Sequence, residues 1–457
     1  MTDPTSSTSP ALAEVTHPVR GMSSRLQERL TVTTLALIAL IFRLWNLQYP
    51  KGFVFDEVYY AQNAESLLHH GVELDPKTGA AQFIVHPPIG KWMIAAGIKL
   101  FGYHEFGWRI SAALVGTASV ILIYYVAKRL FDNYFLSLAA GILTLCDGMH
   151  LVMSRTALLD IFLMFFTLLG FFFLLRSSHW LAGISLGLAS ATKWSGAYYL
   201  LAYFLFTLYV DYRNNRAMEY ENAARKTLRE KLLLRATQYG VLPVFIYVAS
   251  WVGWFANSSG WDRHYSKNIF KSWWYYQDQI LNFHTHLTTP HTYSANPWSW
   301  LIMGRPTSFY YQAPNTCGAK LCSQEVLALG TPLLWWSGVI AIAITFGYWI
   351  ARREWQSGLL LLSLAAGYLP WFEWQKRTVF TFYVIAFEPC IVLIIVYALA
   401  KFLEPGRDGI ISKRRTIASW IFLALIAANF LYFFPLFTGG VITYHHWSTM
   451  MWFPSWI

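Results

Sequence analysis

The sequence carries little charge. Of its 457 residues only 13% are Asp, Glu, Lys or Arg, whereas 56% are hydrophobic. A soluble globular protein has about 25% charged residues and about 45–50% apolar ones. The composition excludes a soluble domain built on one core and predicts an integral membrane protein.

Cysteine is also scarce, and four residues exclude a disulfide-rich scaffold. Cys146 and Cys390 lie in apolar runs, where we expect inert packing. Cys317 and Cys322 lie in a polar loop, Cys-Gly-Ala-Lys-Leu-Cys, which the topology below places outside the membrane. This pair is the candidate disulfide.

Aromatic residues are abundant, with 22 Trp, 27 Tyr and 33 Phe. The net charge of +11 would suit a nucleic-acid-binding protein if the basic residues formed one surface. They lie largely in short segments between apolar runs, where Lys and Arg mark membrane topology. We therefore expect a lipid bilayer around the chain and no nucleic-acid partner.

The apolar runs predict an all-α polytopic membrane protein. About 20 apolar residues cross the hydrocarbon core as a helix, and about 11 such spans can be placed. They cover 31–47, 107–126, 134–150, 156–175, 180–194, 196–211, 237–256, 331–350, 357–371, 379–400 and 416–435.

Lys and Arg gather in alternate connections, chiefly 211–236 and 401–415. The positive-inside rule then predicts a plasma-membrane protein with a cytoplasmic N-terminus and an extracytoplasmic C-terminus. Residues 1–30 lack the apolar segment of a signal peptide and are predicted to be a disordered cytoplasmic tail. The transmembrane module is expected over 31–435, and 436–457 form an outer-face tail.

Two long outer loops, 48–106 and 257–330, carry Trp, Tyr, His and Pro in place of a flexible Ser/Gly mixture. Residues 271–286 and 295–300 are predicted to lie in the membrane–water interface, where aromatic rings are favoured. The working surface is therefore expected on the outer face.

The first outer loop opens with an acidic pair, Asp56 and Glu57, among aromatic and aliphatic residues. A carboxylate in apolar surroundings can have a raised pKa, which suits a general base. Adjacent side chains diverge by about 100° on a helix. We therefore expect one of the two to face the chemistry and the other to hold structure; a solvated acidic pair at a helix start is the alternative.

Residues 86–102 read His-Pro-Pro-Ile-Gly-Lys followed by an apolar run too short to span a membrane. Pro88 can open a helix, with Lys91 one turn in. His86 and Lys91 are candidates for binding a phosphate at the membrane surface, unless Lys91 only extends its charge toward water.

Several charges lie at the outer ends of spans: Arg109, Arg155, Asp160, Lys193 and the pair Lys376–Arg377. Ionisable groups at membrane level are costly and usually mark a substrate path. Cations converging at one depth would suit an anionic lipid headgroup, in particular a leaving phosphate. Asp160 needs a cation partner, and one from another span fits better than Arg155 on the same helix.

This ordered set resembles the protein O-mannosyltransferase family of the GT-C class. The resemblance rests on Asp56-Glu57, His86-Pro87-Pro88 with Gly90-Lys91, Trp108-Arg109, Arg155 with Leu159-Asp160, and Thr192-Lys193-Trp194-Ser195-Gly196, and it covers roughly 31–435. It implies transfer of mannose from polyprenyl-phosphate-mannose to Ser or Thr of exported proteins, with inversion.

The resemblance also implies roles for single residues. Asp56 matches the acidic position of the base, with Glu57 beside it, and Arg109, Lys193, Lys91 and Arg377 would hold the donor phosphate. His86, Arg155, Asp160 and Trp194 are expected to bind substrate or support the site. The chain departs from eukaryotic members, since 257–330 is too short and too aromatic for their β-trefoil MIR domain.

No cofactor and no metal site are expected. The histidines of Phe-His-Thr-His-Leu-Thr-Thr-Pro-His (283–291) have a spacing that could ligate a metal, but no carboxylate or cysteine joins them nearby. Two alternatives stay open: a transferase of the same fold that glycosylates a lipid or lipoglycan, and a flippase or transporter of lipid-linked sugars. Missing repeats disfavour transport, and contact with the secretion channel stays open.

Overall fold

A computed structural model describes residues 22–406, 409 and 411–457. Most of the expected tail 1–30 lies outside the described residues, and its last part, from Met22, already belongs to the first helix. The helices are α1 Met22–Leu44, α2 Glu57–His70, α3 Ile89–Phe101, α4 Glu105–Phe131, α5 Tyr134–Leu145, α6 Gly148–Met153, α7 Asp160–Leu175, α8 His179–Ser190, α9 Gly196–Ala217, α10 Ala223–Ala236, η1 Thr237–Val241, α11 Leu242–Ser250, α12 Val252–Ala256, α13 Ile269–His286, η2 Pro297–Ser299, α14 Pro332–Arg352, α15 Trp355–Tyr368, α16 Pro370–Glu373, η3 Thr381–Phe387, α17 Glu388–Phe402, α18 Lys413–Thr438, α19 Tyr444–Met450 and η4 Pro454–Trp456.

Each predicted span coincides with helical structure. Within the described ranges, five helices are long and apolar enough to cross a membrane by length and composition: 105–131, 223–250, 332–352, 381–402 and 413–438. The other spans are filled by shorter or less apolar helices, such as α5 and α7. The helical, multi-pass character is confirmed, whereas the number of crossings stays a prediction.

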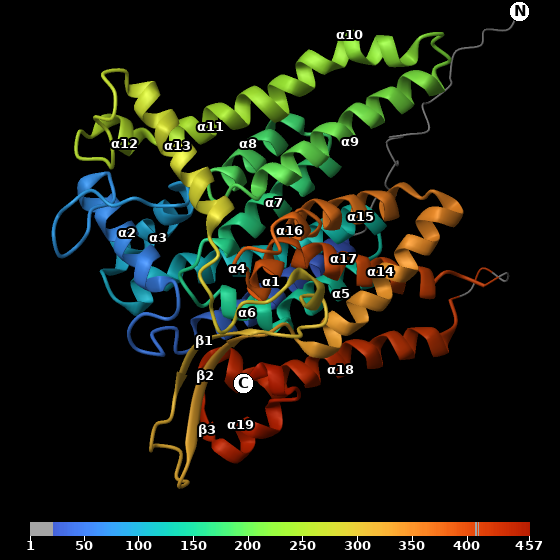
Figure 1. Cartoon of the computed structure of the whole chain (residues 1–457). Coiled ribbons are helices and arrows are strands. Elements are labelled where there is room, and N and C mark those ends of the chain that lie inside the picture. Colours follow the sequence, from blue (N-terminus) through green and yellow to red (C-terminus); the bar gives the residue numbers. More distant parts are fainter. Residues whose placement is uncertain (1–21, 407–408, 410) are drawn as a thin grey trace, which may run out of the picture.

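The two long loops meet at one end of the bundle (Figure 1). Helices α2 and α3 come from the first loop and α12 and α13 from the region that opens the second, and all four gather at the same end. The turns from α9 to α10 and from α14 to α15 lie at the opposite end. The chain therefore concentrates its irregular, aromatic segments on one face.

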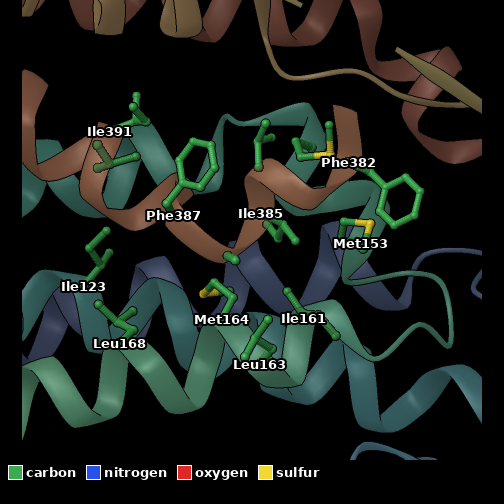
Figure 2. Close-up of a cluster of buried hydrophobic side chains, with 14 of the residues drawn as sticks. Ile123, Met153, Ile161, Leu163, Met164, Leu168, Phe382, Ile385, Phe387 and Ile391 are labelled. Carbon is green, nitrogen blue, oxygen red and sulfur yellow. The ribbon is translucent and has the colours of Figure 1, made fainter. Parts of the chain in front are cut away.

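The middle of the bundle is an apolar core around α7. Figure 2 shows Ile161 and Met164 of α7 facing Phe382 and Ile385 of η3. All four side chains are buried. This packing fixes η3, a 3₁₀ segment, directly over α7, and so determines where the residues at the start of both elements point.

A small sheet was not predicted from the sequence. Strands β1 Thr307–Gln312, β2 Cys322–Ala328 and β3 Val441–Thr443 pair antiparallel in the order β1-β2-β3. The predicted disulfide joins Cys317, within the β1–β2 connection, to Cys322 at the start of β2, with 5.9 Å between the two Cα atoms. The expected helical fold class is confirmed, and this small sheet is a local addition in the second outer loop and the C-terminal tail, where Phe, Tyr and Val favour extended backbone.

Candidate active site

Glu57 is the first residue of α2 and is fully buried. Its carboxylate accepts hydrogen bonds from the backbone N–H of Val54 at 2.9 Å and of Ala157 at 2.9 Å. It also forms an ion pair with Arg109, with 2.7 Å between Nη2 and Oε2. Glu57 therefore joins the first outer loop to α4 and to the segment before α7.

Arg109 is buried and uses every N–H of its guanidinium within the protein. Nε and Nη2 donate to Glu57, at 2.8 and 2.7 Å. Nη1 donates to the carbonyls of Leu47 and Pro50, and Nη2 also to that of Gly52. A guanidinium has five N–H donors, and none of the five is left for a ligand. The expectation that Arg109 contacts a phosphate does not fit this geometry.

Asp56 contrasts with its neighbour. Its carboxylate has no hydrogen-bond or ion-pair partner within the described part of the chain, and it caps no N–H of α2. Burial raises the pKa of Asp56 to about 6; the nearby Asp160 adds to the rise, and Lys193 opposes it. A partly buried carboxylate without a fixed partner can accept a proton from a bound hydroxyl.

The backbone before Asp56 is held by aromatic packing. Phe55 has φ +50°, a left-handed conformation that is costly for a bulky residue. Its ring stacks on Phe309 of β1, with centroids 4.6 Å apart, and meets Phe380 and Phe382 edge-on. Phe55 is held by these rings and Glu57 by its hydrogen bonds and ion pair. Because both neighbours of Asp56 in the chain are fixed, the direction of its side chain is restricted.

Asp160 finds its cation on another connection, as the sequence suggested. Lys193, between α8 and α9, places Nζ 2.9 and 3.1 Å from the two carboxylate oxygens of Asp160. The same Nζ lies 4.9 Å from the ring centroid of Tyr383 in η3. Lys193, Asp160, Tyr383 and Asp56 thus mark a junction of segments that are far apart in the sequence.

The start of α3 approaches this junction closely. The N–H of Ile89 donates to the carbonyl of Ala191 at 3.1 Å. A Cβ on Gly90 would lie 2.8 Å from the side chain of Leu159 and 3.1 Å from that of Thr192. Glycine here allows the His-Pro-Pro segment to pack against the residues that precede Asp160 and Lys193.

Lys91 is buried and paired. Its Nζ donates to Glu73 Oε1 at 2.6 Å and to the carbonyl of His86 at 3.1 Å. Burial lowers the pKa of Lys91, and Glu73 opposes that change. Lys91 therefore holds the first outer loop together, and the expected phosphate contact does not fit its geometry either.

Arg155 also has protein partners. Its Nη1 donates to the carbonyls of Phe42, Arg43 and Trp45, at 3.0, 2.9 and 2.8 Å. Cations stabilise the free carbonyls at a helix C-terminus. Arg155 caps the outer end of α1, which fits the structural role considered for it.

His86 and Arg377 meet at His284 of α13. The imidazole rings of His86 and His284 lie 5.1 Å apart between centroids, and Arg377 Nη2 lies 3.1 Å from His284 Nδ1. Trp194 also packs beside His284, with 6.0 Å between the ring centroids, and its Nε1–H donates to the hydroxyl of Tyr247. Burial and the surrounding cations, among them Lys193, lower the pKa of His86 well below its usual range.

The structure therefore brings together Asp56, Asp160, Lys193, His86, Trp194 and Arg377. The protein itself binds the charges of four other predicted residues: Glu57, Arg109, Lys91 and Arg155. Sequence reasoning missed Tyr383 and Glu73, because nothing in their local sequence marks them. It noted His284 only as a weak metal candidate. Across the described ranges no group of three or more His, Cys, Asp or Glu residues could hold a metal ion.

Two family models match the chain. The dolichyl-phosphate-mannose-protein mannosyltransferase model covers residues 33–256, and the model of the C-terminal four-transmembrane region of protein O-mannosyltransferases covers 269–456. A polyprenol-phosphate-mannose–protein mannosyltransferase of Mycobacterium tuberculosis is 32% identical, over 93% of this chain and 90% of that protein. The chain belongs to the protein O-mannosyltransferase family.

A second relative of the same name, from Mycolicibacterium smegmatis, is 32% identical over 96% of this chain and 95% of that protein. Among solved structures, the Saccharomyces cerevisiae Pmt1-Pmt2 complex bound to the sugar donor matches this mannosyltransferase with a TM-score of 0.80, at 15% identity, over 96% of this chain and 93% of that one. ArnT from Cupriavidus metallidurans bound to undecaprenyl phosphate matches with a TM-score of 0.55, at 16% identity, over 89% and 64%. The GT-C architecture and the family expected from the sequence are confirmed.

Proposed function

We propose that this mannosyltransferase transfers mannose from polyprenyl-phosphate-mannose to Ser or Thr hydroxyls of exported proteins, on the outer face of the plasma membrane. The proposal rests on one observation: the cluster contains both a carboxylate that can accept a proton and cations that can bind a phosphate. Within the described residues the Asp56 carboxylate has no hydrogen-bond or ion-pair partner. Lys193, which is paired with Asp160, acts electrostatically on both Asp56 and His86, and Arg377 acts on His86. The names of the relatives supply the donor and the class of acceptor.

The proposed reaction is a single displacement. Asp56 accepts the proton of the acceptor hydroxyl as its oxygen bonds to C1 of mannose, and the bond from C1 to the phosphate oxygen breaks. Polyprenyl phosphate leaves with the electron pair of that bond. Lys193 and Arg377 stabilise the growing negative charge, and attack opposite the leaving group inverts C1.

The donor carries a single phosphate, which lies near Lys193 and Arg377 in this proposal, and we propose that transfer needs neither a cofactor nor a divalent ion. Addition of EDTA to membranes that contain the enzyme is expected to leave the rate of transfer unchanged. Loss of activity that Mg²⁺ or Mn²⁺ restores would contradict this part of the proposal.

The deciding experiment supplies labelled polyprenyl-phosphate-mannose to membranes that contain the enzyme, with a Ser/Thr/Pro-rich peptide and with extracted membrane lipids in parallel. We expect label in the peptide, released by β-elimination as mannose. Label in a lipid or lipoglycan instead would support the alternative acceptor. Label that only crosses the membrane unchanged would support a flippase.

A further inference from the structure

The imidazole of His284 has two partners on opposite sides. Its Nε2 lies 2.8 Å from the carbonyl oxygen of Val85, directly before the His-Pro-Pro segment. A carbonyl oxygen only accepts hydrogen bonds, so Nε2 carries the proton. In the neutral ring Nδ1 is then an acceptor, and it receives the N–H of Arg377 Nη2 at 3.1 Å.

The neutral form of the ring is favoured. Burial and the adjacent Arg377 lower the pKa of His284 to about 4. The hydrogen bond to Val85 therefore sets the tautomer, and above about pH 4 the neutral ring offers Nδ1 to Arg377 as an acceptor.

Arg377 has few other partners. Its Nε is buried and has no acceptor among the described residues, and the hydrogen bond of its side chain there is the one to His284. Arg377 also lies close enough to His86 to lower the pKa of that imidazole. One side of the guanidinium is thus fixed by protein, while the other still has donors for a ligand.

We propose that His284 is a positioning residue that holds the guanidinium of Arg377 toward the leaving phosphate of the donor. The inference rests on the proposed function and deepens it, because it assigns the orientation of one phosphate ligand to the second outer loop. An arginine side chain loses considerable rotamer freedom when it binds a ligand. Because His284 already fixes one edge of the guanidinium, less of that freedom is lost when polyprenyl-phosphate-mannose binds.

The backbone near Arg377 is held independently of His284. The N–H of Thr378 donates to the carbonyl of Leu287 at 3.0 Å, and the N–H of Ala295 to that of Val379 at 2.8 Å. Removal of the imidazole should therefore release the guanidinium while the segment that carries it stays in place.

The test compares His284→Ala with His284→Asn in the purified full-length enzyme. The amide oxygen of Asn overlays Nδ1 and restores the acceptor for Arg377. We expect His284→Ala to raise the KM for polyprenyl-phosphate-mannose about ten-fold, the loss typical of a hydrogen bond to a charged group. His284→Asn should recover most of that loss, and the KM for the peptide should not change.

His286 is the matched control, because it lies on the same helix, is exposed and contacts Asn282 and Thr285. His286→Asn should leave both KM values unchanged. If His284→Ala does not fold, His284→Gln serves in its place, since its amide N–H reaches toward Val85 while the Nδ1 position lacks an acceptor. His284→Gln should then show the raised donor KM, and His284→Asn should not.

Arg377→Ala and the double variant with His284→Ala distinguish the inference from the proposed function. We expect the two losses to be non-additive, because the imidazole acts through the guanidinium. A normal donor KM in His284→Ala beside a raised one in Arg377→Ala would overturn the inference alone. A normal donor KM in Arg377→Ala would overturn both the inference and the phosphate assignment of Arg377.

Discussion

Asp56 and Glu57 are neighbours in the chain and have opposite surroundings. Glu57 is bonded to two backbone N–H groups and to Arg109, whereas Asp56 is left without a partner in the described structure. The start of α2 explains the division, since adjacent residues on a helix point about 100° apart. At the scale of single residues, the acidic pair is one support and one reactive group.

Substitution of Arg109 tests whether the Glu57–Arg109 pair has a structural role. We predict that Arg109→Lys lowers the free energy of unfolding by at least about 2 kcal/mol, because an ammonium replaces only part of a buried, bidentate pair. Thermal denaturation in detergent measures the change. The KM for polyprenyl-phosphate-mannose of the folded enzyme should stay at the wild-type value. A raised donor KM with unchanged thermal stability would instead indicate that Arg109 binds the donor phosphate.

The pKa of Asp56 determines the pH below which kcat/KM decreases. Burial raises this pKa to about 6, so the unprotonated base is lost as the pH falls through about 6. We predict that kcat/KM falls about ten-fold per pH unit below that point, measured between pH 4.5 and 8 with the peptide acceptor. A limb near pH 4, the ordinary range of aspartate, would contradict the buried environment of this carboxylate.

At the scale of elements, the two outer loops are held together by a close backbone contact. Gly71 ends α2 with φ +72°, and a Cβ on Gly253 of α12 would lie 2.0 Å from the carbonyl oxygen of Gly71. The side chain of Asn257 adds a hydrogen bond to the carbonyl of His70 at 2.9 Å. Glycine at position 253 therefore allows the loop that bears Asp56 to rest on α12, directly before the second outer loop.

Gly253→Ala is expected to separate these elements, because the nearest atom is backbone and cannot turn away. We predict a lower melting temperature and faster proteolysis of the outer loops. Gly347→Ala is the matched control: it lies in α14, and apart from the backbone of its own helix no atom of the described residues lies within 4 Å of the added Cβ. Alanine there should stabilise the helix by about 1 kcal/mol at most. Equal effects of the two substitutions would show that the loops do not depend on this contact.

Sequence reasoning located the helices and the loops that carry the chemistry, because span length and motif order are local properties. The ion pair of Asp160 with a cation on another connection followed from the cost of a buried carboxylate. The pairing of Arg109 with Glu57 and of Lys91 with Glu73 could not be foreseen, since it depends on which loops meet in space. The sheet was missed because the apolar runs around it dominate the pattern.

At the scale of the whole molecule, the chain has two unlike ends. The candidate site and both outer loops lie at one end, and the turns near Met218 and Arg353 lie at the other (Figure 1). Lys and Arg are frequent at this second end, as in Arg213, Arg216, Arg352 and Arg353. The positive-inside rule places that end in the cytoplasm.

Cysteine labelling tests the orientation. Lys77 in the first outer loop and Met218 after α9 are both exposed. We predict that Lys77→Cys reacts with a membrane-impermeant maleimide on intact cells, and that Met218→Cys reacts only after permeabilisation. The unmodified chain is the control: Cys146 is buried and Cys317 and Cys322 are bridged, so any background label comes from Cys390, which is half-buried in α17. The reverse pattern would invert the topology and move the site to the cytoplasm.

The assignment of Asp56 as the base is the centre of the account. The most direct test measures transfer of labelled mannose from polyprenyl-phosphate-mannose to the Ser/Thr/Pro-rich peptide by Asp56→Asn, with expression and melting temperature matched to the wild type. Asp75→Asn is the control: this half-buried acid of the same loop accepts hydrogen bonds from Lys77 and Thr78 through Oδ1, which asparagine retains, and the variant should be fully active. We predict that Asp56→Asn loses at least about 100-fold in kcat. Wild-type turnover in Asp56→Asn would contradict the account.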